Sequence, residues 1–240
     1  MPRIALIDFL RGVALLGMTA FHFVYDLEYF GLREPGYSDR LHWWTLATIV
    51  AGSFLFLTGA SLYLAHNKEI RWSPWSQRLA IIVLAAVAIT VVTRLATPDV
   101  YIFFGILHMI AIASIVGLAF LRAPWWAAVA VAAAILAVDE LIAIEWLNAS
   151  PLSWLGLGSV APVTSDFRPV FPWLAPALLG VGAAKMCHRA GWLQVLAAPK
   201  LEGRSGNAVR FIGRHSLVYY LLHQPVLFSL IWFWLQFSEQ

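Results

Sequence analysis

The feature that most constrains this chain is a succession of apolar stretches, each running for roughly 18 or more residues with almost no charge. Such a stretch is long enough to span the hydrocarbon core of a bilayer. Of the 240 residues, 61% are hydrophobic and only 12% are charged, whereas a soluble domain has about 45–50% and about 25%. Because this excess is spread along the whole chain, one oily core does not explain it. The sequence therefore predicts an all-α, polytopic transmembrane helix bundle that forms a single domain over residues 1–240.

The apolar stretches also predict how often the chain crosses the membrane. About seven spans are expected, near residues 4–26, 43–65, 77–96, 102–121, 124–142, 170–188 and 208–236. The last of these is long enough to be tilted or broken. Basic residues gather on one side of this scheme, namely Arg3, Lys68, Arg71, Arg78, Arg122, Lys185, Arg189, Lys200, Arg204 and Arg210. Since cytoplasmic loops carry the excess of Lys and Arg, we expect a cytoplasmic N-terminus and an external C-terminal tail.

The first predicted span carries a stripe of polar residues. An i, i+3, i+4 rhythm places six residues on one face of a helix, namely Asp8, Arg11, Leu15, Met18, His22 and Asp26. Four of the six are ionisable. At ~1.5 Å per residue, Asp8 and Asp26 are roughly 27 Å apart, so the stripe runs from one membrane surface to the other. Ionisable groups are costly against lipid, and the stripe should therefore face the interior of the bundle.

Two histidines are candidates for catalysis. His22 and Asp26 can pair at i, i+4, and a carboxylate that holds an imidazole fixes its tautomer and raises its basicity, as a general base requires. The alternative is a hydrogen-bonded pair that packs two helices together. His42 precedes the second span and could be a catalytic base or an acyl-accepting nucleophile. Its alternative is a surface anchor beside Trp43 and Trp44.

Other polar residues suggest binding roles. Near the outer ends of the spans, charges of both signs would suit a polar acceptor such as a sugar, or would form surface ion pairs; they belong to Arg94, Asp99, His108, Asp166 and Arg168. Tyr219 and His223 share a face of the last span, where they could bind substrate or pack helices. Arg210, Arg214 and His215 lie near the cytoplasmic surface and could meet phosphates, or could be plain positive-inside residues.

The net charge and the cysteine content exclude several classes. A formal charge of +3 with no long Lys/Arg run does not suggest nucleic acid as a partner. The single Cys187 excludes an intramolecular disulfide. His22, Asp26 and His42 could be metal ligands, but nothing fixes a third ligand, and no metal is expected.

Five groups of residues occur in the order seen in one known family: 7–14 with 21–23, then 53–59, 105–108, 166–173 and 213–225. Together they resemble the heparan-α-glucosaminide N-acetyltransferase catalytic-domain family, particularly its small bacterial members. The resemblance implies a membrane-embedded acyltransferase. Such an enzyme would move an acetyl or other short acyl group from cytosolic acetyl-CoA to a sugar, lipid-linked glycan or other polar acceptor on the non-cytoplasmic side.

The resemblance also implies roles for particular residues. In similar enzymes the catalytic histidine lies in the outer loop before the second helix, so His42 is the nearest counterpart and His22 the competing candidate. The CoA phosphates would meet basic residues at the cytoplasmic end of the bundle. The residues expected to form this end of the donor site are Asp8, Arg11, Arg210, Arg214 and His215. The alternative for Asp8 and Arg11, which are spaced i, i+3, is a plain ion pair at the membrane surface.

Two other functions fit the same sequence. A polar stripe across the bilayer also suits the proton or substrate path of a transporter or flippase, although no internal repeat is evident. A non-catalytic subunit of a complex that builds the cell envelope is the third possibility. The expected surroundings are the lipid bilayer of a bacterial inner membrane, and a homo-oligomer is possible.

Overall fold

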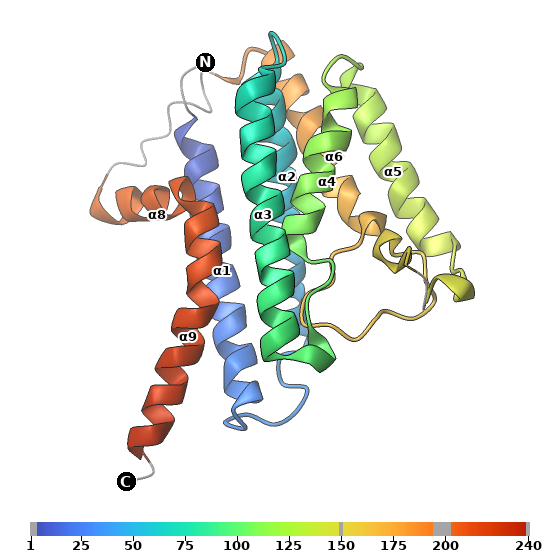
Figure 1. The fold of residues 1–240 in the computed structure, drawn as a ribbon. Helices are drawn as coiled ribbons and strands as arrows, with labels where there is room; N and C mark the ends of the chain where they lie inside the picture. The colour runs from blue at the N-terminus through green and yellow to red at the C-terminus, as the bar shows by residue number, and fades with distance from the viewer. Residues whose placement is uncertain (1–3, 149–150, 194–202, 239–240) are drawn as a thin grey trace. The chain divides into compact units, whose positions relative to one another are not determined.

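The computed structural model describes residues 4–148, 151–193 and 203–238, which Figure 1 shows as a ribbon. Arg3 and Lys200 lie outside these residues. The described residues form eight α-helices with short 3-10 turns and no strand: α1 (Ala5–Tyr29), α2 (Leu41–His66), α3 (Trp72–Ala96), α4 (Ile106–Phe120), α5 (Trp125–Leu141), α6 (Val170–Arg189), α8 (Arg204–Arg214) and α9 (Ser216–Ser238). The predicted all-α class is confirmed.

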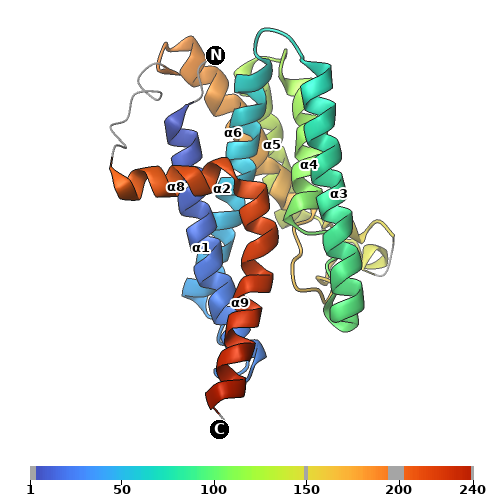
Figure 2. The same cartoon turned by 60° about the vertical axis from the view of Figure 1, so that its left-hand side comes forward.

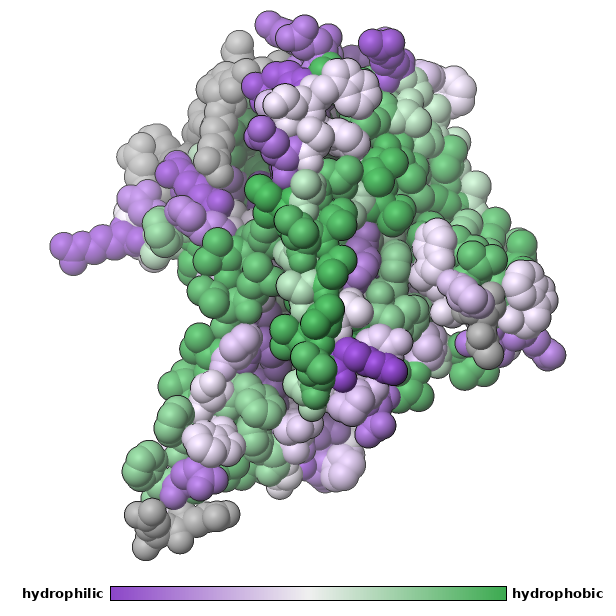
Figure 3. Space-filling view, in the orientation of Figure 1, coloured by the Kyte–Doolittle hydropathy of each residue, from purple (hydrophilic) through white to green (hydrophobic). Residues whose placement is uncertain are grey.

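Five of these helices are long and apolar enough to cross a membrane, namely α1, α2, α3, α6 and α9. Figure 3 shows the apolar side chains of α3 as a continuous column on the surface, as expected of a helix that faces lipid. α4 and α5 have 15 and 17 residues. At ~1.5 Å per residue they extend about 23–26 Å, short of a hydrocarbon core of about 30 Å. A count of about seven spans and a cytoplasmic N-terminus stay predictions.

Contacts divide the chain into two compact units. The terminal unit contains α1, the first part of α2 up to Phe54, α8 and α9. The central unit contains the rest of α2 from Leu55, followed by α3, α4, α5 and α6. The prediction of a single domain stays a prediction.

Glycines set the spacing of two helices in the central unit. A methyl group on Gly59 of α2 would overlap the Ala177 carbonyl of α6, and one on Gly180 of α6 would overlap the Phe56 carbonyl of α2. The two backbones therefore touch at a reciprocal crossing. Small residues at such a crossing are typical of helices that pack inside membranes, where close van der Waals contact replaces the hydrophobic effect.

In the terminal unit, α1 and α9 lie side by side and run in the same direction, as both views in Figures 1 and 2 show. Three hydrogen bonds join the helices, and their residue numbers rise together: Thr19 with Tyr219, His22 with His223, and Asp26 with Gln224. If both helices cross the membrane, the chain between them must cross an odd number of times. α2, α3 and α6 alone meet this condition, and so do all five helices from α2 to α6.

The last predicted span, 208–236, is two helices rather than one. α8 ends at Arg214, His215 has a non-helical backbone, and α9 begins at Ser216. Figure 2 shows α8 lying across α1, whereas α9 runs along it. α8 carries three arginines in 11 residues. Because charged side chains are expensive in hydrocarbon, this segment leaves the path of the span and packs across the N-terminal half of α1.

Candidate functional site

The polar stripe of α1 is covered by α8 and α9, as its predicted inward orientation required. Asp8 and Asp26 are 2% and 1% exposed, and Leu15 between them is fully buried. Two groups of contacts follow along the stripe within the terminal unit. One lies where α8 crosses the start of α1, and the other lies where α9 runs beside its second half.

A pair of histidines forms the centre of the second group. The Nδ1 atom of His22 lies 2.8 Å from Nε2 of His223. His223 is 8% exposed, and its Nδ1 atom lies 2.6 Å from the backbone oxygen of Tyr220. The structure thus brings the predicted catalytic residue His22 against His223, which the sequence suggested as a substrate-binding residue.

Asp26 does not form the hydrogen bond to His22 that the i, i+4 spacing suggested. Gln224 Nε2 donates to Asp26 Oδ1 at 2.6 Å, and Asp26 Oδ2 is buried without a hydrogen-bond partner among the described residues. The physical reason is that α9 packs on this face of α1 and supplies His223 to His22 and Gln224 to Asp26. Sequence reasoning gave Gln224 no role, although its polar side chain next to His223 in an apolar helix was an available signal.

The hydroxyl of Tyr219 is held by the hydroxyl of Thr19, a residue to which sequence reasoning gave no role. Thr19 Oγ1 donates to the Leu15 carbonyl at 2.9 Å, and the Tyr219 hydroxyl lies 2.9 Å from the same Thr19 oxygen. Since the Thr19 proton is already used, Tyr219 is the donor of this bond. The Tyr219 ring lies parallel to the His223 ring at 6.2 Å between centroids.

The first group is built on an ion pair. Arg214 Nε lies 3.3 Å from Asp8 Oδ2, and the Arg214 side chain is 43% exposed. The helices are in backbone contact here, because a methyl group on Gly213 would overlap the Asp8 carbonyl and one on Gly12 would overlap the Val209 carbonyl. The buried carboxylate therefore holds a cation whose side chain still reaches the surface.

The other residues predicted for donor binding lie in the same part of the unit. Arg11 is partly buried on α1. Arg210 of α8 is partly buried, and its Nε has no hydrogen-bond partner among the described residues. His215 is exposed beside Phe211, with a centroid distance of 4.3 Å. These side chains, with Arg214, give the crossing of α1 and α8 a positive character.

His42 lies apart from these hydrogen-bonded groups. It is exposed in the first turn of α2, and its ring lies 5.2 Å from that of Trp43. Within the part of the chain that the structure describes, no hydrogen bond reaches its imidazole. Its catalytic role stays a prediction.

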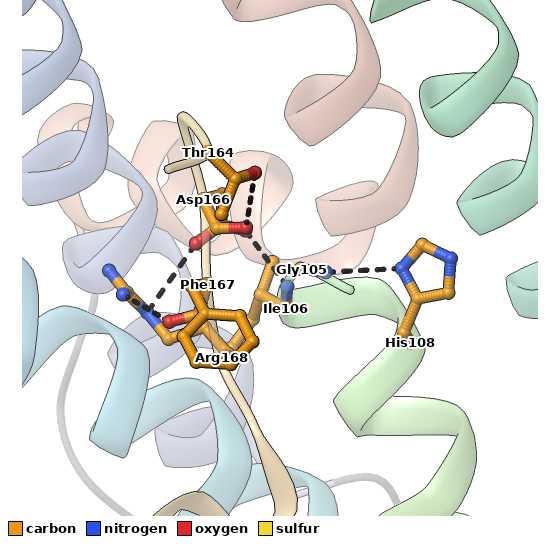
Figure 4. A network of polar contacts seen from close by, with 7 residues as sticks. All are labelled: Gly105, Ile106, His108, Thr164, Asp166, Phe167 and Arg168. Carbon is orange, nitrogen blue, oxygen red and sulfur yellow. Dashed lines mark hydrogen bonds and ion pairs between the residues drawn. The ribbon is translucent and has the colours of Figure 1, made fainter. Parts of the chain in front are cut away.

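A separate polar network occupies the start of α4 in the central unit (Figure 4). Ile106 N donates to Asp166 Oδ2 at 2.9 Å, so this carboxylate caps the helix. Asp166 Oδ1 lies 3.5 Å from Arg168 Nε, and the Arg168 guanidinium lies 4.8 Å from the centre of the Trp173 ring. Asp166 and Arg168 are thus joined to one another and to the backbone of α4.

His108 belongs to the same network. Gly105 N donates to its Nδ1 at 3.2 Å, and its Nε2 lies 3.4 Å from Thr90 Oγ1. Arg94 and Asp99, the other predicted acceptor-binding residues, are exposed. The contacts of His108, Asp166 and Arg168 define local structure, and their roles in substrate binding stay predictions. Among the described residues, no group of three or more His, Cys, Asp or Glu could hold a metal ion.

Five helices long and apolar enough to cross a membrane, with ionisable side chains paired between α1 and the helices that cover it, define a helical integral membrane protein. Comparison with protein families matches residues 3–225 to the model described as "Heparan-alpha-glucosaminide N-acetyltransferase, catalytic". The chain belongs to this family, and the resemblance noted in its sequence is confirmed. Searches of curated proteins and of solved structures give no significant match.

Proposed function

We propose that this protein is a membrane-embedded acyltransferase that uses acetyl-CoA from the cytoplasm. The acetyl group would pass to a sugar or another polar acceptor, free or lipid-linked, on the opposite side of a bacterial inner membrane. Family membership supports acetyl transfer as the reaction. The donor, the acceptor and the direction of transfer are the parts that we propose.

One observation carries the proposal: polar groups near both ends of α1 contact side chains of α8 and α9. Arg214 pairs with Asp8 at one end, and His223 contacts His22 further along. These two positions on α1 are 14 residues apart, or roughly 21 Å along a helix. A donor with phosphates at one end and a thioester at the end of a long arm fits a site whose charged and histidine groups are separated in this way.

Basic residues at the crossing of α1 and α8 would bind the CoA phosphates. Guanidinium groups suit this task because their planar fork matches phosphate oxygens. The guanidinium groups at this crossing belong to Arg11, Arg210 and Arg214, and His215 lies beside them. Asp8 would orient Arg214 without binding the phosphates itself.

His22 would act as the general base. Its imidazole would take a proton from the N–H or O–H of the acceptor as that atom attacks the thioester carbonyl. The new bond to the acetyl carbon forms, the carbon–sulfur bond breaks, and the departing CoA thiolate takes up the proton to become the thiol. His42 is the competing base, and His22 is favoured because it alone of the two is held in a hydrogen-bonded network.

The first test is binding of acetyl-CoA to the purified protein in detergent, measured by calorimetry with ATP and free CoA as controls. We expect saturable binding that requires the CoA moiety. Arg210→Gln should weaken it by roughly tenfold or more, since a hydrogen bond to a charged group contributes about 1.5–3 kcal/mol. Absence of binding by well-folded protein would contradict the donor role and favour a transport function for the polar stripe.

The second test is transfer of a labelled acetyl group to a panel of amino sugars and sugar alcohols. His22→Gln should bind acetyl-CoA as the wild type does and should lose turnover, since an amide cannot accept the proton. His42→Gln serves as the matched comparison. Full turnover by His22→Gln together with loss of turnover by His42→Gln would reverse the assignment of the base.

A further inference from the structure

The contact between His22 and His223 determines where the protons of both rings lie. The Tyr220 carbonyl can only accept, so the 2.6 Å contact to His223 Nδ1 requires a proton on that nitrogen. A neutral His223 then has an unprotonated Nε2. That atom lies 2.8 Å from His22 Nδ1, which must therefore carry the proton of this second bond. Neutral His22 is thus left with an unprotonated Nε2.

From this geometry we infer that His223 is a positioning residue that sets the tautomer of His22. The inference rests on the proposed function, in which His22 is the general base. A general base must present an unprotonated nitrogen to the acceptor. The backbone carbonyl of Tyr220 fixes the tautomer of His223, and His223 in turn keeps the proton of neutral His22 on Nδ1. The nitrogen of His22 that can accept a proton is therefore Nε2.

The surroundings of His223 make it suitable for this role. It is 8% exposed, so water does not compete for its ring nitrogens. Tyr219 lies parallel to it, with an angle of 5° between ring planes, and Tyr219 is in turn hydrogen-bonded to Thr19 of α1. The imidazole is therefore held in one orientation by groups on both helices. Partners of this kind commonly orient the group that performs the chemistry.

The same contact also supports His22 after it accepts a proton. The imidazolium retains its Nδ1 proton and donates it to His223 Nε2. A hydrogen bond with a charged donor is roughly twice as strong as a neutral one. His223 therefore stabilises the charge that appears on His22 during proton transfer.

The experiment compares two substitutions of His223. The side-chain oxygen of His223→Gln can accept a bond from His22 Nδ1, whereas His223→Leu offers no acceptor. Histidine labelled with ¹⁵N reports tautomers by nuclear magnetic resonance, and loss of one resonance pair in His22→Gln assigns His22 among the seven histidines of the chain. We expect the Nδ1–H tautomer of His22 in the wild type and in His223→Gln, and its loss in His223→Leu.

Turnover provides the second measurement. His223→Leu should lower kcat by roughly 10- to 100-fold, the range seen when the hydrogen-bonded partner of a metal-bound histidine is removed, with the KM for acetyl-CoA unchanged. His223→Gln should restore most of kcat. His188→Gln is the matched control, because it removes a histidine bonded to Tyr63 in the central unit. It should leave both the tautomer and the turnover as they are.

The outcomes separate this inference from the proposed function. An Nε2–H tautomer of His22 in the wild type, or the same tautomer in all three proteins, would overturn the positioning role. If the tautomer depends on His223 but no variant, nor the wild type, transfers acetyl groups, then the contact is as described and the proposed function fails. If the tautomer follows the prediction while His223→Leu keeps full kcat, the catalytic part of the inference is refuted.

Discussion

The two buried carboxylates of α1 have different partners. Asp8 lies beside the guanidinium of Arg214, a cation, at 3.3 Å. Asp26 accepts a hydrogen bond from the neutral amide of Gln224, and its second oxygen has no hydrogen-bond partner among the described residues. A buried charge is tolerated when it is paired and becomes costly when its partner is removed. The pair at Asp8 can therefore be tested by substitution of either member.

Arg214→Gln should destabilise the protein by about 1–3 kcal/mol, less than a fully buried pair would cost because the arginine is partly exposed. The substitution leaves the Asp8 carboxylate buried without the cation that Arg214 supplies. Asp8→Asn combined with Arg214→Gln replaces both charges by amides and should recover most of the loss. Thermal unfolding in detergent measures both variants. A double variant as unstable as Arg214→Gln alone would show that the ion pair is not the cause.

Residues on the stripe could be predicted from the sequence, but their partners could not. The spacing of Asp8, His22 and Asp26 on one helix indicated a common face. Nothing in that spacing tells which later helix covers the face, and the partners lie 206 and 201 positions away at Arg214 and His223. The local i, i+4 rule therefore suggested a bond from Asp26 to His22 that the packing of α9 replaces.

At the scale of elements, the crossing of α1 and α8 depends on two glycines. Gly12→Ala places a methyl group against the Val209 carbonyl, which is backbone and cannot turn aside. We expect a loss of about 1–3 kcal/mol, the usual cost of forcing extra volume into a packed contact. Thermal unfolding in detergent is again the measurement, and weaker binding of acetyl-CoA should accompany the loss of stability.

Gly52→Ala is the matched control for this substitution. Gly52 is also a helical glycine in the terminal unit, and a methyl group there meets nothing within 4 Å. Since alanine favours helix by about 0.5–1 kcal/mol over glycine, this variant should be as stable as the wild type or more stable. Equal destabilisation by both alanines would refute the close crossing at Gly12.

The sequence predicted the bounds of most apolar helices to within a few residues, because hydropathy and length alone identify such a stretch. This holds for α1, α2, α4, α5 and α6, whereas α3 begins earlier than expected, at Trp72. The stretch 208–236 was expected to be tilted or broken, but its sequence did not indicate that the break lies at His215. Two causes act together: the arginines of α8 are expensive in hydrocarbon, and Gly213 lets α8 pack closely against Asp8 of α1. The second cause depends on a helix at the other end of the chain.

At the scale of the whole molecule, the parallel course of α1 and α9 predicts the side on which each end lies. If α1, α2 and α9 all cross the membrane, α2 returns to the side from which α1 starts, so the segment that follows α2 should lie opposite the end of α9. Cysteines at Glu69 and Ser238, both exposed positions, introduced singly into a Cys187→Ser background, test this. In intact cells an impermeant maleimide should label Ser238→Cys alone, and Glu69→Cys should react only after lysis.

Permeabilised cells supply the control, because both cysteines should then react equally. Labelling of both positions from the same side would contradict the odd number of crossings between α1 and α9. Labelling of Glu69→Cys alone would keep the parity and reverse the proposed orientation. Either result would be independent of the chemistry proposed for His22.

The pairing of the first helix with the last has a consequence for biosynthesis. The ribosome delivers α1 to the membrane before any residue of α8 or α9 exists, and at about 5–20 residues per second the remaining chain of about 200 residues takes roughly 10–40 s. During that interval Asp8 lacks Arg214 and Asp26 lacks Gln224, the partners that α8 and α9 supply in the finished protein. A chain that stops short of α8 never gains these two partners, and we expect membrane quality control to recognise such a fragment by its unpaired polar groups in the bilayer.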